Sequence, residues 1–219
     1  QYIAARARAA QILLQQGKTD EARELLHATR GGSAGEQAQL AIAEAQLLRE
    51  AGRGGDAYAV LEAALAHDPD SPELLYETAL TAERQGKPEV MEKHLRRLLT
   101  LKPEHAHALN ALGYSLADRN IRLAEAQDLI TRALALAPQD PFIMDSMGWV
   151  QFRLGQLPEA LKTLETAYGI KADPEIAAHL GEVLWTMGRK DEAAHLLKEA
   201  TKKHPDNDVL TGAVKKFAP

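Results

Sequence analysis

Small residues recur along the chain at nearly constant spacing. Two helices can approach closely only where side chains are small, so each recurrence predicts a helix crossing. A fixed period of this length is typical of repeat proteins, in which each unit stacks on the next. One series, 33 to 35 residues apart, is Ala10, Ala45, Ala79, Gly113, Gly148 and Gly181. A second series with the same period is Ala22, Ala57, Met91, Ala126, Ala160 and Ala193, in which Met91 stands where the other units have Ala.

Each repeat is predicted to hold two helices. A glycine closes the first helix in five of the six units, because glycine readily adopts the left-handed conformation that ends helices. These glycines are Gly17, Gly52, Gly86, Gly155 and Gly188. An acidic residue opens the second helix, as Glu21 and Glu159 do, and acidic side chains suit a helix N-terminus. The prolines fall between units or in the turns within them, never in a helix interior.

The pattern predicts an all-α protein, an α-solenoid of about six helix pairs that forms a single array over 1–219. Three irregular places stand out. The fourth unit lacks the glycine of its internal turn, the segment 31–36 is expected to be a loosened loop, and Gln151 stands where an apolar core residue is expected. The last helix is either a cap or the first helix of a truncated unit. The predicted units are 3–36, 38–71, 72–105, 106–140, 141–173 and 174–206, followed by a helix at 208–219.

Composition narrows the possible functions. The net charge of −5 gives no basic footprint for nucleic acid. There is no cysteine, which excludes disulfides, thiolate nucleophiles and cysteine zinc sites. The eight histidines are scattered, and no zinc-protease or phosphate-loop motif occurs. We therefore expect no enzyme activity, no cofactor and no bound metal in this array.

The chain carries no predicted membrane anchor. It has no run of 18 apolar residues, so we expect no direct membrane insertion. It begins with Gln1 rather than Met and shows no signal peptide. We interpret it as a piece of a longer protein.

The repeat pattern resembles the tetratricopeptide repeat family over essentially the whole chain. The segments ALNALGYSLADRN, AEAQDLITRALALAP and EIAAHLGEVLWTMGRKDEAAHLLKEATKKHP carry the resemblance most clearly. It implies a right-handed superhelix whose first helices line a concave groove, where this family usually holds peptides. The implied function is a protein-interaction scaffold or adaptor with a protein or peptide partner.

The family's groove positions can be carried over to this chain one by one. Both tryptophans fall on them, and Tyr, Trp and Arg are the residues that most often anchor interfaces. A groove lined in this way suits an extended or helical peptide with bulky apolar side chains, whose backbone Asn110 could bind. The predicted groove residues are Tyr76, Arg84, His107, Asn110, Tyr114, Asp118, Phe142, Asp145, Trp149, Arg153, Glu182 and Trp185.

Packing offers an alternative for part of this set. Phe152, also at a groove position, could swing inward to replace Gln151. Trp149 and Trp185 could pack against the neighbouring repeat, because a large amphipathic ring can serve both needs. Asp145 and Arg153 could form a plain surface pair.

The last three units look similar to proteobacterial tetratricopeptide lipoproteins of the outer membrane. Some members of that group act as adaptors for a carboxyl-terminal processing protease. The resemblance implies a periplasmic array, anchored through a missing N-terminus; otherwise we expect a cytoplasmic one. Two alternatives remain: the non-catalytic part of a larger enzyme-bearing protein, or a self-assembling array. In a self-assembling array, Val214 and Phe217 would form an exposed stacking face of a homodimer.

Overall fold

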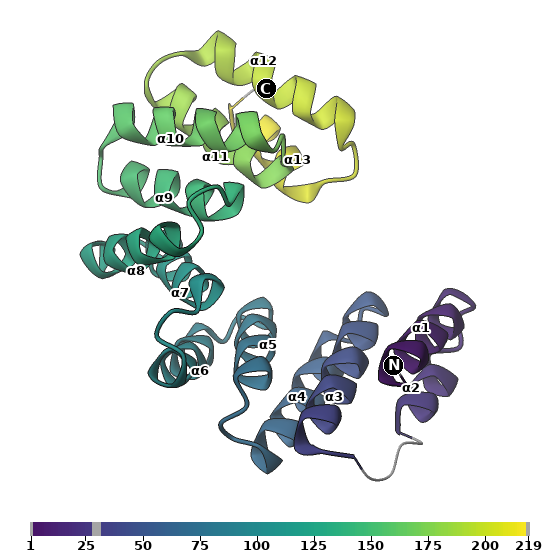
Figure 1. The fold of residues 1–219 in the computed structure, drawn as a ribbon. Coiled ribbons are helices and arrows are strands. Elements are labelled where there is room, and N and C mark those ends of the chain that lie inside the picture. Colours follow the sequence, from purple (N-terminus) through teal and green to yellow (C-terminus); the bar gives the residue numbers. More distant parts are fainter. Residues whose placement is uncertain (1, 28–31, 218–219) are drawn as a thin grey trace. The chain divides into compact units, whose positions relative to one another are not determined.

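The structure is a computed structural model that describes residues 2–27 and 32–217. Within these residues it contains thirteen α-helices and no strand, which confirms the predicted all-α class (Figure 1). In chain order the helices are α1 (Tyr2–Gln15), α2 (Thr19–His27), α3 (Ala34–Glu50), α4 (Gly54–His67), α5 (Pro72–Arg84), α6 (Pro88–Leu101), α7 (Ala106–Asp118), α8 (Leu123–Leu136), α9 (Pro141–Arg153), α10 (Leu157–Ile170), α11 (Pro174–Thr186), α12 (Lys190–Lys203) and α13 (Asp208–Phe217).

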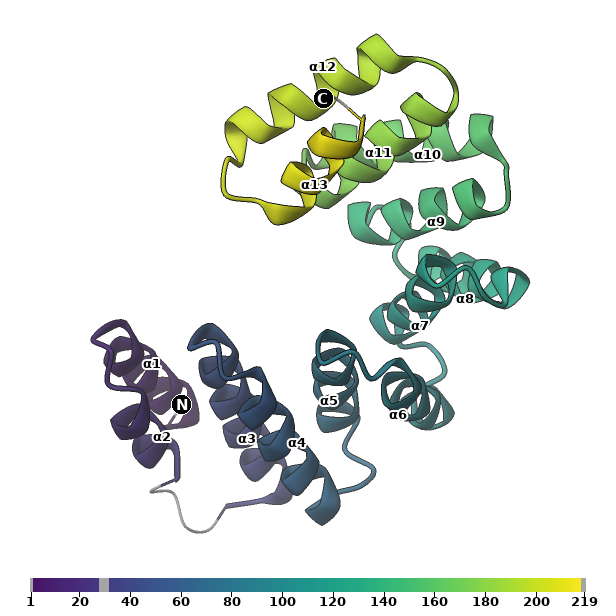
Figure 2. The same cartoon turned by 180° about the vertical axis from the view of Figure 1, so that it is seen from behind.

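The helices group into two compact units, residues 1–103 and 104–219. The first unit holds the pairs α1/α2, α3/α4 and α5/α6. The second holds α7/α8, α9/α10 and α11/α12, followed by α13. The two helices of each pair lie side by side in both views (Figures 1 and 2). A single array over 1–219 stays a prediction.

The small residues lie where the two helices of a pair cross, as predicted. A Cβ atom on Gly148 would lie 2.5 Å from Cγ of Leu164, on the partner helix. A Cβ on Gly113 would lie 2.6 Å from Cγ1 of Ile130. Both distances are shorter than any normal carbon contact, so only glycine permits this approach of α9 to α10 and of α7 to α8.

Left-handed residues close the first helices. The five predicted glycines have φ values between 69° and 82°. In the fourth repeat, where no glycine is available, Asn120 at φ 54° and Arg122 at φ 48° take the left-handed conformation. This turn is one residue longer than the other turns within pairs, and its two non-glycine residues take the left-handed conformation at a cost in backbone strain.

The second helix pair starts earlier than the sequence predicted. Ser33 caps α3 by accepting a hydrogen bond from the backbone N–H of Glu36, whose side chain accepts one from the N–H of Ser33. This capping box satisfies two backbone donors, so residues 34–36 are the first turn of α3. The predicted loop is wrong for these residues, and α3 begins four residues before the predicted unit boundary at 38. Residues 28–31 lie outside the described part.

Helix α13 covers the end of the second unit. Leu210, Ala213 and Phe217 pack with Ala177 and Leu197 of the preceding pair, and Phe217 is only 6% exposed. The predicted exposed stacking face at Val214 and Phe217 is therefore wrong, because α13 turns these residues toward α11 and α12.

The position of the small series also distinguishes α13 from the other first helices. Lys215, 34 residues after Gly181, is exposed where the other first helices have Gly or Ala. The interpretation of α13 as a cap or as the first helix of a further unit stays a prediction. Across the residues placed by the structure, no helix has the length and apolar character needed to cross a bilayer.

Candidate functional site

The first helices of the second unit lie in the order α7, α9, α11 and α13, each beside the next. This row carries ten of the twelve predicted groove residues. Four lie on α7: His107, Asn110, Tyr114 and Asp118. Four lie on α9: Phe142, Asp145, Trp149 and Arg153. Two lie on α11: Glu182 and Trp185.

His179 joins three of these helices. Its Nδ1 lies 2.9 Å and 3.0 Å from the two carboxylate oxygens of Asp145 on α9. Its Nε2 lies 3.5 Å from the hydroxyl of Tyr114 on α7. The Asp145 side chain is 8% exposed and the His179 side chain 13%, so water competes little for this contact.

The environment of His179 favours its protonated form. Burial by itself lowers the pKa of the imidazole, since it penalises the charged form. Attraction to the Asp145 carboxylate and the hydrogen bond to it act in the opposite direction, with smaller contributions from Glu175 and Asp118. The net result is that the pKa of His179 is raised above its ordinary value.

Trp149 is buried between repeats. It is 4% exposed, and its ring stacks on His179 with centroids 4.2 Å apart and on Phe152 with centroids 5.1 Å apart. The Arg153 guanidinium lies over the same ring, 4.6 Å from its centroid. Trp149 and Asp145 therefore lie on a predicted groove helix but are not open to solvent, because His179 covers both, and partner binding by either residue stays a prediction. Packing against the neighbouring repeat, the alternative considered for Trp149, is confirmed.

Opposite charges pair across neighbouring first helices. An Arg153 Nη atom donates to the backbone carbonyl of Asp118 at 2.9 Å and lies 3.7 Å from its carboxylate. Lys216 on α13 lies 3.1 Å from Glu182 on α11. The alternative of a plain surface pair between Asp145 and Arg153 is wrong, because each of these side chains pairs with a residue of a neighbouring repeat instead.

Several predicted residues stay accessible. Phe142 is 42% exposed, with the Lys171 ammonium 4.3 Å from its ring centroid, and His107 is exposed. Trp185 is partly buried against Phe217, with ring centroids 6.0 Å apart. These side chains leave aromatic surface on the row of first helices.

Two further residues of the row turn toward the protein. Phe152 packs onto the core of α10 and α11, which supports its inward alternative. The side-chain oxygen of Asn110 is buried without a hydrogen-bond partner among the described residues. Binding of a peptide backbone by Asn110 stays a prediction.

Tyr76 and Arg84 lie on α5 of the first unit. Arg84 is exposed at the last residue of the helix. Tyr76 is partly buried, and desolvation raises the pKa of its phenol, with a smaller contribution from Glu77. Helix α5 also pairs with α3, the preceding first helix. Arg49 of α3 donates to Glu77 at 3.3 Å and to Thr81 at 3.0 Å, both on α5. Polar pairing between consecutive first helices therefore occurs in both units.

Sequence reasoning missed His179 and Lys216. The family's groove positions include neither residue. His179 is one residue away from such a position, and Lys216 lies on α13, beyond the six predicted units. A pattern of opposite charges one repeat apart would have found them: Asp145 and His179 are 34 residues apart, as are Glu182 and Lys216.

Comparison with known proteins gives consistent matches. Sequence models of the tetratricopeptide repeat match residues 3–28, 42–90, 92–141 and 151–215. A TPR repeat-containing protein of Pseudomonas aeruginosa is 40% identical over 181 residues, which are 83% of this chain. The chain spans only 31% of the length of that relative.

Two solved structures share the fold. A thermophilic TPR protein of Thermus thermophilus has 25% identity and a TM-score of 0.72, with 81% of this chain and 97% of that chain covered. PilF of Pseudomonas aeruginosa has 18% identity and a TM-score of 0.64, with 86% of this chain and 95% of that chain covered.

Proposed function

Because this chain belongs to the tetratricopeptide repeat family, whose members are generally protein-interaction scaffolds, we propose that it binds a protein or peptide partner along its first helices. In this proposal the array itself is non-catalytic, as is typical of the family. The observation that carries the proposal is the row formed by α7, α9, α11 and α13, which carries both aromatic and charged side chains.

The proposed binding surface has a rigid base and an accessible outer layer. Trp149, Asp145 and His179 form the base, since Trp149 and Asp145 are buried, His179 is partly buried, and mutual contacts fix all three. Phe142 and His107 belong to the outer layer, where a partner would contact them. A base that is already ordered reduces the entropy lost on binding, which favours affinity.

Site-specific crosslinking would test this proposal. A photoreactive phenylalanine analogue is placed at His107 or Asp118, which are exposed on α7, and the protein is irradiated in a lysate of the source organism. The matched controls carry the analogue at Lys162 of α10 or Lys198 of α12, exposed positions on second helices. We expect a discrete crosslinked product from the α7 positions only.

Crosslinks formed only from Lys162 or Lys198 would show that the partner binds the second helices instead of the first helices. A lack of any crosslink at all four positions would contradict partner binding by this unit. Circular dichroism of each variant establishes that the helices are retained before irradiation.

A finer proposal concerns the cellular context. We propose that the longer protein is a cell-envelope adaptor, periplasmic and tethered to the outer membrane, that brings substrates to a carboxyl-terminal processing protease. The support is the similarity of the last three repeats to outer-membrane tetratricopeptide lipoproteins. Fractionation of cells that produce the full-length protein would place it in the periplasm or outer membrane, and recovery from the cytoplasm would contradict the proposal.

A further inference from the structure

A small pocket lies between α1 and α3, two consecutive first helices of the first unit. Its volume is about 60 Å³, which gives room for the end of one side chain, whereas sites for drug-sized ligands occupy about 300–1,000 Å³. Apolar side chains such as Leu14 and Leu47 form its walls, and its polar lining residues are Gln11, Gln46 and Glu50. The pocket therefore combines an apolar interior with one carboxylate and two amides.

The repeat explains why this space is open. Gln11 and Trp149 each follow the small residue of a helix crossing, so they occupy the same place in their repeats. Ala43 and His179 correspond in the same way, since each precedes that small residue by two positions. In the second unit, the rings of Trp149 and His179 stack between α9 and α11, with centroids 4.2 Å apart. Neither Gln11 nor Ala43 has a ring, so the equivalent space between α1 and α3 stays open.

The Glu50 carboxylate keeps its negative charge uncompensated. Nε2 of Gln11 lies 3.5 Å and 3.4 Å from the two carboxylate oxygens of Glu50, and Nε2 of Gln46 lies 3.3 Å from one of them. These amides donate hydrogen bonds but carry no charge. In the part of the chain that the structure describes, no Lys or Arg pairs with Glu50.

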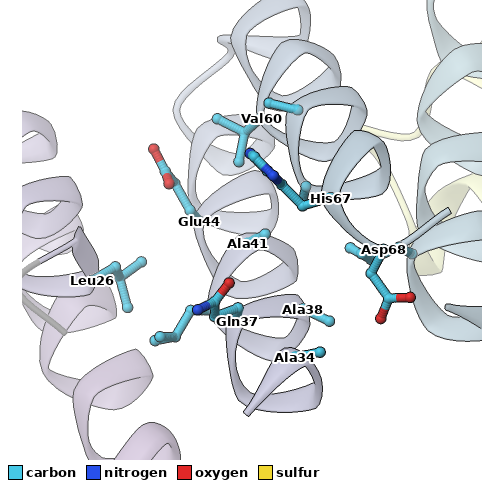
Figure 3. Close-up of a pocket in the computed structure, with 13 residues that line it drawn as sticks. Leu26, Ala34, Gln37, Ala38, Ala41, Glu44, Val60, His67 and Asp68 are labelled. Carbon is cyan, nitrogen blue, oxygen red and sulfur yellow. The ribbon is translucent and has the colours of Figure 1, made fainter. Parts of the chain in front are cut away.

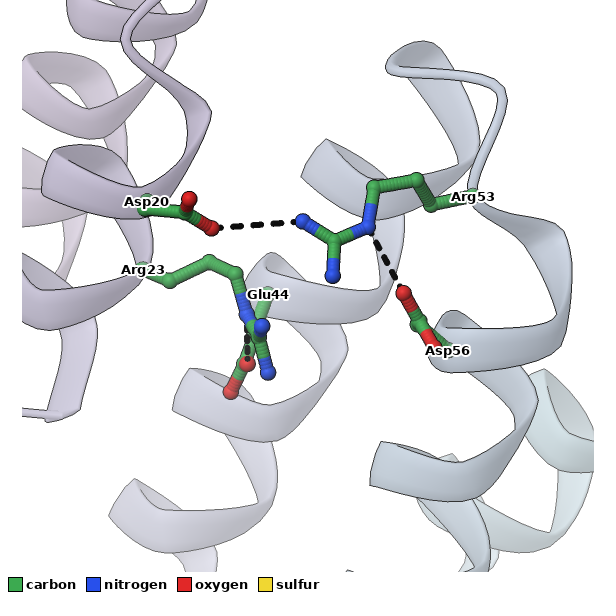
Figure 4. A network of polar contacts seen from close by, with 5 residues as sticks. All are labelled: Asp20, Arg23, Glu44, Arg53 and Asp56. Atoms are coloured by element: carbon green, nitrogen blue, oxygen red, sulfur yellow. Dashed lines mark hydrogen bonds and ion pairs between the residues drawn. The ribbon is translucent and has the colours of Figure 1, made fainter.

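The arginines nearest to Glu50 in the sequence are paired with other carboxylates. Arg49 donates to Glu77 of α5 at 3.3 Å. Arg53 bridges Asp20 of α2 at 3.3 Å and Asp56 of α4 at 2.6 Å (Figure 4). Neither guanidinium therefore neutralises the carboxylate at the pocket.

A different hollow of the first unit lies on another side of α3. Figure 3 shows Glu44 of α3 and Leu26 of α2 in this hollow, which shares no lining residue with the pocket at Glu50. The Glu44 carboxylate accepts from Arg23 at 2.9 Å (Figure 4). The two carboxylates of α3 thus differ, because only Glu44 has a basic partner.

The pocket is built from residues that the structure describes. Gly32, the first described residue after 28–31, lies at the opposite end of α3 from Glu50, and this helix is about 25 Å long. Tyr2, which follows residue 1, is about 13 Å along α1 from Gln11. Neither gap in the description therefore adjoins the pocket.

We propose that this pocket binds an arginine or lysine side chain of a protein partner. The apolar walls take up the methylene stem, since both side chains bury their stems against apolar surface and leave the charged group outside. That group pairs with the Glu50 carboxylate in charge-assisted hydrogen bonds, and the amide oxygens of Gln11 and Gln46 accept further ones. The site lies on the first unit and does not depend on the surface proposed for the second unit.

NMR titration would test the proposal. The whole 219-residue chain is labelled with ¹⁵N, and the side-chain amide signals of Gln11 and Gln46 report binding at the pocket. The probes are N-acetyl-arginine amide and N-acetyl-lysine amide, with N-acetyl-norleucine amide as the control that has an apolar stem and no charge. We expect both basic probes to bind at least about tenfold more tightly than the norleucine probe. Equal binding of the three, or no saturable shift with either basic probe, would overturn the proposal.

Two variants of α1 assign the binding to the pocket. Ala7 lines the pocket and Ala9 does not, and both are partly buried. Other repeats carry Ile42 and Leu112 at these two places, so a leucine suits the fold at either position. We expect Ala7→Leu to weaken binding of the arginine probe about tenfold by filling the pocket, and Ala9→Leu to leave it unchanged. Equal binding by the two variants would refute the assignment.

Two charge variants test the role of the carboxylate. Glu50→Gln should remove the preference for arginine over norleucine, because it deletes the charge and keeps the size of the side chain. Glu24→Gln removes the same charge from an exposed position of α2 and should retain the preference. A preference that persists in Glu50→Gln, or that is lost equally in Glu24→Gln, would show that Glu50 does not bind the basic group.

Discussion

Nδ1 of His179 lies 2.9 Å from Oδ1 of Asp145, in a partly buried pair that joins α11 to α9. The two residues are 34 positions apart, one repeat length. The same relation recurs between Glu182 and Lys216. Polar pairs one repeat apart thus fix consecutive first helices to each other, in addition to the apolar contacts between repeats.

The first prediction concerns the pH dependence of stability. The pKa of His179 is raised in the folded protein, so protonated His179 stabilises the fold. This contribution is complete below the unfolded pKa of about 6.5 and is lost as the pH rises through the higher folded value. Denaturant unfolding of wild type and His179→Gln across this range should give a difference in unfolding free energy that shrinks with rising pH.

Subtracting the two curves removes contributions that both proteins share. His94 is one of these, because burial lowers the pKa of His94 despite the attraction of Glu62, and its contribution changes with pH in the opposite direction. A stability difference that stays constant with pH would mean that protonation of His179 does not stabilise the fold.

The second prediction separates packing from partner contact at Trp149. Trp149→Ala should lower the unfolding free energy by about 3–5 kcal/mol, since it deletes a buried ring that contacts three neighbouring side chains. Phe142→Ala, at a position 42% exposed, should change it by less than about 0.5 kcal/mol. Thermal melts followed by circular dichroism measure both. If Trp149→Ala melted at the same temperature as wild type, the result would show that this ring is exposed rather than buried.

The third prediction concerns the helix crossing at Gly148. Gly148→Ala should destabilise the protein by about 1–3 kcal/mol, because the added methyl would overlap Leu164 and force the helices apart. Gly169→Ala is the matched control, since Gly169 lies on α10 with no atom within 4 Å of an added Cβ. It should raise stability by about 0.4–1 kcal/mol. Urea unfolding gives the change in unfolding free energy for both variants, which we expect to have opposite signs. A stabilising Gly148→Ala would contradict the close crossing of α9 and α10.

The fourth prediction concerns the turn between α7 and α8. Arg122 has φ 48°, a strained conformation for a residue with a side chain. Arg122→Gly should therefore raise the unfolding free energy by about 0.5–1 kcal/mol. The ion pair with Glu125, at 3.7 Å and 45% exposed on the arginine side, contributes little against this gain.

A left-handed glycine in the turn of the next repeat is the control for this prediction. Gly155→Ala, at φ 77°, should lower stability by about 1 kcal/mol for the same reason. The midpoint of urea unfolding measures the stability of both variants. A loss of stability in Arg122→Gly would show that the contacts of the arginine side chain contribute more to stability than relief of the backbone strain.

The period of small residues determined the helix pairs, their order and most of their ends. A glycine or alanine at a crossing, a left-handed glycine in a turn and a capping serine or aspartate act locally. Their effect can therefore be read from a few neighbouring residues. Even the exception in the fourth repeat was visible as a missing glycine. The loop predicted over 31–36 is wrong at 34–36, because the capping box of Ser33 and Glu36 starts a helix there despite the three glycines of the segment.

Which side chains are open on the row of first helices was decided only by the tertiary structure. The family's groove positions include Trp149, yet its exposure depends on what the next helix presents, and that helix presents His179. Contacts between residues 30 or more positions apart combine the shapes of two helices, and a pattern within one helix does not contain that information.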